Sequence, residues 1–146
     1  MVGIASLANA NAPEGKKISL FYNQTNKNLA LEQRNEHNKS DSPVTVYVSP
    51  DVSQAGIIEN PSQVAATDLD GLTIVFGFTA PKPDPDGKPL PNHDVSIISP
   101  VYRPVGTTLK SNKTIAAASY GSSASVFYLV YVYAEPLVSL ICACPY

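Results

Sequence analysis

Apolar and polar residues alternate in short runs along most of the chain. The clearest run is at residues 44–48, where Val44, Val46 and Val48 alternate with Thr45 and Tyr47. Alternation with a period of two predicts β-strands with one buried and one exposed face. Residues 29–39 come closest to a helical pattern, but the run is short and ends in asparagines. We therefore expect an all-β protein.

A repeated unit is visible in three places. Each unit begins with a strand of small residues, continues through a turn, and returns in a strand of β-branched or aromatic residues; the strand pairs are 4–6 with 18–22, 64–67 with 72–76, and 115–120 with 124–128. When the units are aligned on a Ser/Thr position, Ser19 precedes Thr73 by 54 residues and Thr73 precedes Ser125 by 52. Unrelated hairpins also share such residues, but they do not predict the near-equal spacing. The chain is interpreted as one repeat-containing domain, residues 1–146, with units at about 1–60, 61–112 and 113–146.

Further strands complete the first two units. Residues 29–33 and 44–48 follow the first hairpin, and a proline-rich loop at 81–92 separates residues 73–78 from 94–98. Four strands in about 40–50 residues are typical of a β-propeller blade, whose inner strand favours small residues. The predicted fold is all-β, a partial β-propeller of about three four-stranded antiparallel blades.

Several of these segments resemble the blades of the fungal fucose-specific lectin family. The segments are Ile18–Gln24, Asn28–Leu31, Ile115–Gly121 and Val126–Tyr128. The resemblance implies a propeller that binds fucosylated glycans in pockets between adjacent blades. The arginine of the family's second strand falls on Ser19, Thr73 and Ser125, and the glutamate of its third strand falls on Leu31, with Glu32 one residue later. The chain also has no tryptophan.

The resemblance also implies six blades, which is twice the number of units found here. We therefore expect a truncated product, half of a homodimeric ring, or a sequence misread after Leu129. An unclosed array leaves strand edges bare, and bare edges pair with other chains. The sequence thus predicts self-association, or pairing with a missing half-propeller.

The first unit holds the candidate sugar site. Tyr22 lies on the second strand, and Glu32 and Arg34 lie two residues apart on the third, so that both face the same side of a sheet. In a sugar site, tyrosine would stack on the sugar, arginine would donate to hydroxyl groups, and glutamate would accept from them. The alternative is a surface ion pair beside a core aromatic residue, worth at most about 1 kcal/mol.

Composition and motifs narrow the function classes. Charged residues make up 15% of the chain and the net charge is −2, so no basic surface is expected to attract nucleic acid or an anionic membrane. His37 and His93 are expected in solvated loops without a nucleophile motif. Cys142 and Cys144 are read as small apolar residues. Aspartate–glycine pairs near residues 68–71 and 84–87 indicate turns rather than calcium loops. We expect no metal, no cofactor and no enzymatic activity.

The N-terminal residues lack the basic and apolar regions of a signal peptide, which favours a cytoplasmic location. The function predicted from the sequence is lectin-like binding of carbohydrate, with fucosylated glycans as the first candidates and without catalysis. The alternative is a non-binding structural or interaction fragment of a truncated propeller protein.

Overall fold

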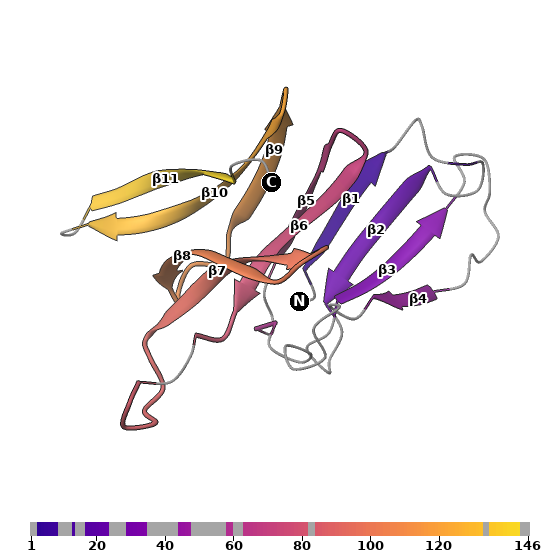
Figure 1. Ribbon diagram of the computed structural model, residues 1–146. Coiled ribbons are helices and arrows are strands. Elements are labelled where there is room, and N and C mark those ends of the chain that lie inside the picture. The colour runs from indigo at the N-terminus through magenta and orange to yellow at the C-terminus, as the bar shows by residue number, and fades with distance from the viewer. Residues whose placement is uncertain are drawn as a thin grey trace.

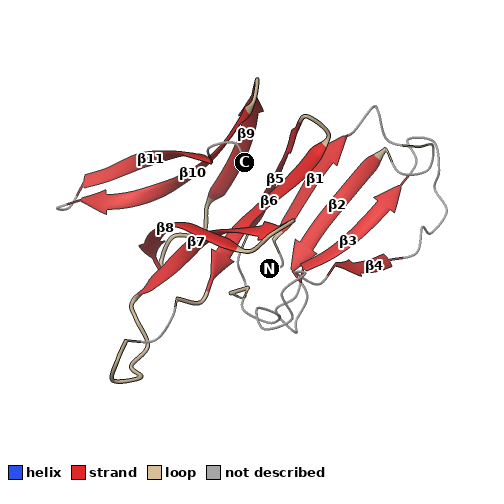
Figure 2. Cartoon of the chain, viewed as in Figure 1, coloured by secondary structure: helices blue, strands red, loops and turns tan. Residues whose placement is uncertain are grey.

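The structure is a computed structural model of the 146-residue chain. It describes residues 3–8, 13, 17–23, 29–34, 44–47, 58–59, 63–81, 84–132 and 135–143. For residues 34, 44–47, 128–132 and 135–143 only the backbone is described. Every regular element in these ranges is a β-strand, as Figure 2 shows, so the all-β prediction is confirmed.

The strands form three antiparallel sheets. The first sheet contains β1 (Ile4–Ala8), β2 (Ile18–Asn23), β3 (Leu29–Arg34) and β4 (Val44–Tyr47) in chain order. The second contains β5 (Val64–Leu69), β6 (Leu72–Thr79), β7 (Asn92–Ser99) and β8 (Arg103–Leu109), also in chain order. The third contains β9 (Ile115–Tyr120), β10 (Ser123–Val132) and β11 (Glu135–Ala143), so within the described residues it has three strands where four were expected.

The first strands of the three sheets lie next to one another. β5 contacts β1 on one side and β9 on the other, and the remaining strands of each sheet fan out from this line (Figure 1). This is the arrangement of blades in a propeller, where the innermost strands line the axis. The chain is therefore a partial, open propeller, as the sequence predicts.

The three sheets share a repeated pair of residues. Each second strand carries a phenylalanine directly opposite an alanine of the first strand; the pairs are Ala5–Phe21, Ala65–Phe76 and Ala116–Phe127. In each sheet the residue before that alanine is β-branched, namely Ile4, Val64 or Ile115. The repeat is thus expressed as equivalent positions on the paired strands.

The pairing also corrects the alignment of the second unit. Counted from the two-residue turns, Ser125 in the third sheet corresponds to Ile74, not to Thr73. Ser19 occupies the same position in the first sheet, two residues before Phe21. The anchor spacings are therefore 55 and 51 residues rather than 54 and 52. The error arose because the hydroxyl-bearing Thr73 lies one residue before the equivalent position, which is occupied by Ile74.

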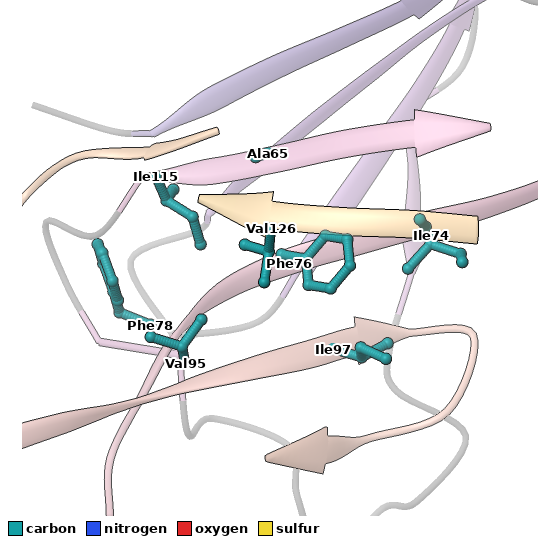
Figure 3. Close-up of a cluster of buried hydrophobic side chains, with 9 residues drawn as sticks. Ala65, Ile74, Phe76, Phe78, Val95, Ile97, Ile115 and Val126 are labelled. Carbon is teal, nitrogen blue, oxygen red and sulfur yellow. The ribbon is translucent and has the colours of Figure 1, made fainter. Parts of the chain in front are cut away.

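Two apolar clusters join the sheets. The cluster between the second and third sheets contains the buried residues Ala65, Ile74, Phe76, Phe78, Val95, Ile97, Ile115, Ala124 and Val126 (Figure 3). The cluster between the first and second sheets contains Phe21, Leu29, Ile58, Val64, Val75 and Ile98. Neighbouring residues of β6, such as Val75 and Phe76, enter different clusters because successive side chains point to opposite faces. The second sheet is therefore buried on both faces.

Tight turns close the inner hairpins of the second and third sheets. At the β5–β6 turn Asp70 and Gly71 have φ angles of 51° and 84°, and the Asp68 carboxylate accepts a 2.9 Å hydrogen bond from the Gly71 N–H. Two successive positive φ angles match the twist of paired strands. Asp84 accepts a bond from the Lys88 N–H in the proline-rich loop. Both aspartate–glycine segments are turns, as expected.

Candidate functional site

The candidate sugar residues lie on the first sheet. Tyr22 of β2 is paired with Ala30 of β3, and Glu32 is paired with Leu20, two positions along. Directly paired residues share a face, so Tyr22 and Glu32 are diagonal neighbours on one side of the sheet. Such neighbours are about 7–8 Å apart, which is within reach of long side chains. The predicted grouping of Tyr22 with Glu32 on one face is therefore present.

Arg34 is placed by its backbone alone. It is the last residue of β3 and is paired with Ile18. Its side chain lies outside the described part of the structure, so its role in a sugar site stays a prediction.

Leu31 and Glu32 occupy different faces of β3. Leu31 packs against the cluster that joins the first and second sheets, and the pairing of β2 with β3 is continuous from Ile18 to Asn23. No bulge brings Glu32 to the position where the lectin family carries its glutamate. The position of that family's arginine is taken by Ser19, which is buried. The family's polar pair is thus replaced in this sheet by apolar and hydroxyl groups.

The face that carries Tyr22 is exposed along β1 and partly buried along β2 and β3. Ile4, which pairs with Tyr22, is 67% exposed, whereas the equivalent Val64 and Ile115 are 4% and 7% exposed. Tyr22 and Glu32 are themselves half-buried, and Ala30 between them is fully buried. This side of the first sheet is called the rear face below; its described side chains are Ile4, Ser6, Ala8, Ile18, Leu20, Tyr22, Ala30 and Glu32.

A second polar group, around His93, was not expected from the sequence. His93 belongs to β7 and is 2% exposed, so the prediction of a solvated loop histidine is wrong. Its ring stacks on Phe78 with centroids 5.4 Å apart. The alternation of His93 with Val95 and Ile97 is the signal that places it on the buried face. His37, the other histidine, lies outside the described residues.

Both ring nitrogens of His93 face protein groups. Nε2 lies 3.1 Å from the carbonyl oxygen of Lys110, and Nδ1 lies 3.5 Å from a carboxylate oxygen of Glu59. A carbonyl can only accept, so Nε2 carries the proton of the neutral ring. Burial lowers the pKa of His93 below 6.5, against the opposing effects of the Lys110 carbonyl and the Glu59 charge. The ring is therefore neutral near pH 7, and its Nδ1 lone pair faces Glu59.

The remaining candidate features are a metal site, the two cysteines and a membrane-spanning helix. Among the described residues, no group of three or more His, Cys, Asp or Glu side chains could hold a metal ion. Cys142 is paired with Ser125 at the end of β11, and Cys144 lies outside the described range. No helix in the described part of the chain is long and apolar enough to cross a membrane.

The chain is similar to two fungal proteins of known name. Both are called wall-associated proteinase, one from Coccidioides immitis and one from Coccidioides posadasii, and each is 35% identical over 115 residues. The match covers 73% of this chain but 33% of each relative, so the chain spans about a third of their length.

These names hint at a relation to proteinases, so the expectation that the chain is not an enzyme stays a prediction. No family model matches the chain. No solved structure matches it either. The proposed function therefore rests on the fold and on the residues of the rear face of the first sheet.

Proposed function

We propose that the chain binds carbohydrate through the rear face of its first sheet, as a lectin-like protein without catalysis. The observation that supports this is the pairing of β2 with β3, which places the half-buried Tyr22 and Glu32 as diagonal neighbours on one face, next to the small Ala30. An aromatic ring can pack against the C–H face of a sugar, and a carboxylate accepts hydrogen bonds from hydroxyl groups. Arg34, two residues beyond Glu32, would add a donor.

Fucosylated glycans are the first ligands to examine, because the strands resemble blades of fungal fucose-specific lectins. The names of the similar Coccidioides proteins place those proteins at a cell wall. Walls are rich in polysaccharide, and a sugar-binding sheet would account for attachment to one. Ser19 and Leu31 occupy the positions of the lectin family's arginine and glutamate. Any fucose bound by this chain would therefore be held by other contacts than those of the family.

Proteolysis is the second candidate, and it is favoured by the names of the relatives. In a Ser–His pair the imidazole must accept the proton of the nucleophile. Nε2 of His93 is used to donate to the Lys110 carbonyl, and Nδ1 faces the Glu59 carboxylate. The ring is also buried and stacked on Phe78. The geometry of His93 therefore supports a structural role rather than that of a general base.

A glycan array tests the proposal directly. We expect the folded chain to bind at least one class of glycan, and Tyr22→Ala or Glu32→Gln to reduce that binding at least tenfold. Tyr102→Ala and Asp86→Asn are matched controls, because Tyr102 is half-buried like Tyr22 and Asp86 is an exposed acid in a distant loop. Binding that survives both site substitutions would place the site elsewhere.

A protease assay separates the two candidates. The purified chain is incubated with a denatured protein substrate, and cleavage is followed with and without His93→Phe. We expect no cleavage by either form. Cleavage that disappears in His93→Phe, while circular dichroism shows the fold intact, would favour the proteinase reading over the lectin reading.

A further inference from the structure

The two ends of the row of sheets expose faces that match the faces already joined inside the chain. We call the place where two neighbouring sheets pack a joint. In each joint the face of one sheet that points toward the next sheet in the chain, its forward face, packs on the opposite face of that next sheet, its rear face. Phe21 and Leu29 on the forward face of the first sheet meet Val64 and Val75 on the rear face of the second. The same relation holds between the second and third sheets, where Phe76 meets Ile115 and Val126. One kind of interface is therefore used twice.

The forward face of the third sheet has no sheet covering it among the described residues. It carries Ala116, Ala118, Ser125 and Phe127, by the same alternation that places Ala117 and Val126 against the second sheet. Phe127 is equivalent to Phe21 and Phe76, which are 4% and 0% exposed, yet Phe127 is only half-buried. Ala116 and Ala118 are exposed. The phenylalanine that is buried in both joints is thus only partly covered in the third sheet.

The rear face of the first sheet is the matching surface. Ile4 is equivalent to Val64 and Ile115, and Leu20 is equivalent to the fully buried Val75 and Val126. Ile4 is nevertheless 67% exposed and Leu20 is half-buried. On β1 and β2 this face carries no charged residue, and neither do the described positions of the forward face of the third sheet. On β3 the rear face carries the charged Glu32, and the described positions of the forward face of the third sheet present no like charge to oppose it.

We propose that a second copy of this chain covers these ends, with the forward face of its third sheet packed on the rear face of the first sheet of its neighbour. The occupant is a second copy because both halves of the joint are present on the same chain and repeat a joint that the chain already makes twice. Such a head-to-tail contact is heterologous, and it closes into a ring when the rotation between copies permits.

A hydroxyl pair at the inner joint fixes the register of the proposed contact. Thr67 Oγ1 of β5 donates to Ser119 Oγ of β9 at 3.0 Å. Counted from the alanine–phenylalanine pairs, Ala118 is the forward-face equivalent of Thr67, and Ala8 is the rear-face equivalent of Ser119. Ala118 of one copy is therefore expected next to Ala8 of another. Both alanines are exposed in the single chain.

Cysteine pairs convert this register into a test. The variant Ala8→Cys/Ala118→Cys is expected to form a disulfide between copies under mild oxidation, seen as a reducible multiple of the 15.5 kDa chain in gel electrophoresis. Each single variant carries the same native cysteines and is the matched control. Thr67→Cys/Ser119→Cys should form its disulfide within one chain and shows that the joint geometry supports the bond.

Association of the unmodified chain is measured by light scattering over a range of concentrations. We expect dimers or larger closed assemblies, and we expect Ile4→Glu or Phe127→Glu to give monomers of unchanged circular dichroism. Val101→Glu, at a residue 53% exposed in the loop before β8, is the control and should leave association intact. A monomer at every concentration, with a disulfide in Thr67→Cys/Ser119→Cys but none in Ala8→Cys/Ala118→Cys, would overturn the proposal.

Both proposals use the rear face of the first sheet, so association would cover Tyr22 and Glu32. Glycan binding is therefore measured on the Phe127→Glu variant, whose rear face is unchanged. Monomeric Phe127→Glu that binds no glycan refutes the lectin proposal alone. A monomer that binds glycan through Tyr22 refutes the association alone. The two assays use different readouts, so the failure of one proposal is not mistaken for the failure of the other.

Discussion

Gly77 and Ile98 pack so closely across β6 and β7 that a Cβ atom on Gly77 would lie 3.1 Å from Cδ1 of Ile98. The same Cβ would lie 3.6 Å from a methyl group of Val64. Both neighbours belong to the cluster between the first and second sheets. The glycine is therefore favoured by the close approach of side chains from the flanking strands β5 and β7 of the same sheet.

We expect Gly77→Ala to lower the free energy of unfolding by about 1–3 kcal/mol, because an added methyl overpacks a filled core. Ile98→Val removes the Cδ1 atom in question and should cost about 0.5–1.5 kcal/mol alone. In the double variant the two losses should be less than additive, since the valine leaves room for the alanine. Urea denaturation of the four proteins measures this. Strict additivity would show that Ile98 is not the group that excludes a side chain at position 77.

Phe76 and Phe78 are the largest fully buried side chains in the cluster between the second and third sheets. Figure 3 shows its ring beside Val126 of the third sheet. Phe76→Ala should lower the free energy of unfolding by about 3–5 kcal/mol, because it leaves a cavity at the joint. The control Val101→Ala removes an exposed apolar side chain and should change stability by less than about 0.5 kcal/mol. Comparable losses in both variants would contradict the assigned core.

The buried His93 should make the protein less stable in acid. Its pKa is lowered from 6.5 in the folded state, so below pH 6.5 the unfolded chain binds more protons than the folded chain. The contribution of His93 is complete above pH 6.5 and is lost as the pH falls from 6.5 through the folded pKa. Glu59, Lys110 and Lys113 are the charged groups that act on it. Denaturation between pH 7.5 and about pH 5 should show this fall, and an NMR titration of the ring gives the folded pKa.

Glu59→Gln provides the control for this interpretation. The Glu59 charge raises the pKa of His93, so its removal should lower that pKa further and extend the loss of stability to lower pH. His93→Phe, which can still stack on Phe78, should flatten the pH dependence in the same range. A pH profile that His93→Phe leaves unchanged would assign the acid sensitivity to other groups.

Asp94, next to His93, should show the opposite dependence. Burial raises its pKa above 3.8, so the folded chain holds this proton more tightly than the unfolded chain. The stability from this group is present below pH 3.8 and is lost as the pH rises through the folded pKa. Asp94→Asn should therefore be more stable than the unmodified chain at neutral pH, with the gain disappearing in acid. Thermal denaturation at pH 7 and pH 3 would check both the sign and its reversal.

The strands and their order follow from local patterns, whereas the sites depend on register. Alternation and turn residues are sufficient to place the hairpins, because they act within a few positions. The alignment of Thr73 failed because a one-residue shift moves a side chain to the other face, and a hydroxyl alone does not reveal that shift. The expected loop position of His93 failed for a related reason. Its ring contacts Phe78, Lys110 and Glu59, which are distant from it in sequence.

The candidate site was predicted only in part for the same reason. Glu32 and Tyr22 were expected on one face of a hairpin, and the pairing of β2 with β3 places them there. That this face lacks a covering sheet among the described residues could not be read from the residues of the hairpin. It depends on which faces of the three sheets are joined, and only the packing of β1 against β5 establishes that.

Thr79 and Ser96 form a buried hydroxyl pair whose energetics can be isolated. Their oxygen atoms are 2.7 Å apart, and both residues are 0% exposed on the side of the second sheet that faces the first. Removal of one partner leaves the other polar group buried without that bond, at a cost of about 1–3 kcal/mol. Thr79→Val and Ser96→Ala should each be destabilising by such an amount.

The double variant decides whether the two hydroxyl groups act as a pair. Once both are removed, no buried hydroxyl is left unsatisfied by the change, so the second substitution should cost much less than it does alone. We expect a coupling of about 0.5–3 kcal/mol in the double-mutant cycle, measured by urea denaturation. Ser125→Ala, combined with Thr79→Val, is the comparison for additivity because it lies in the third sheet. Additive losses in Thr79→Val/Ser96→Ala would mean that each hydroxyl is satisfied by a different group, and that the 2.7 Å contact contributes nothing to joining β6 to β7.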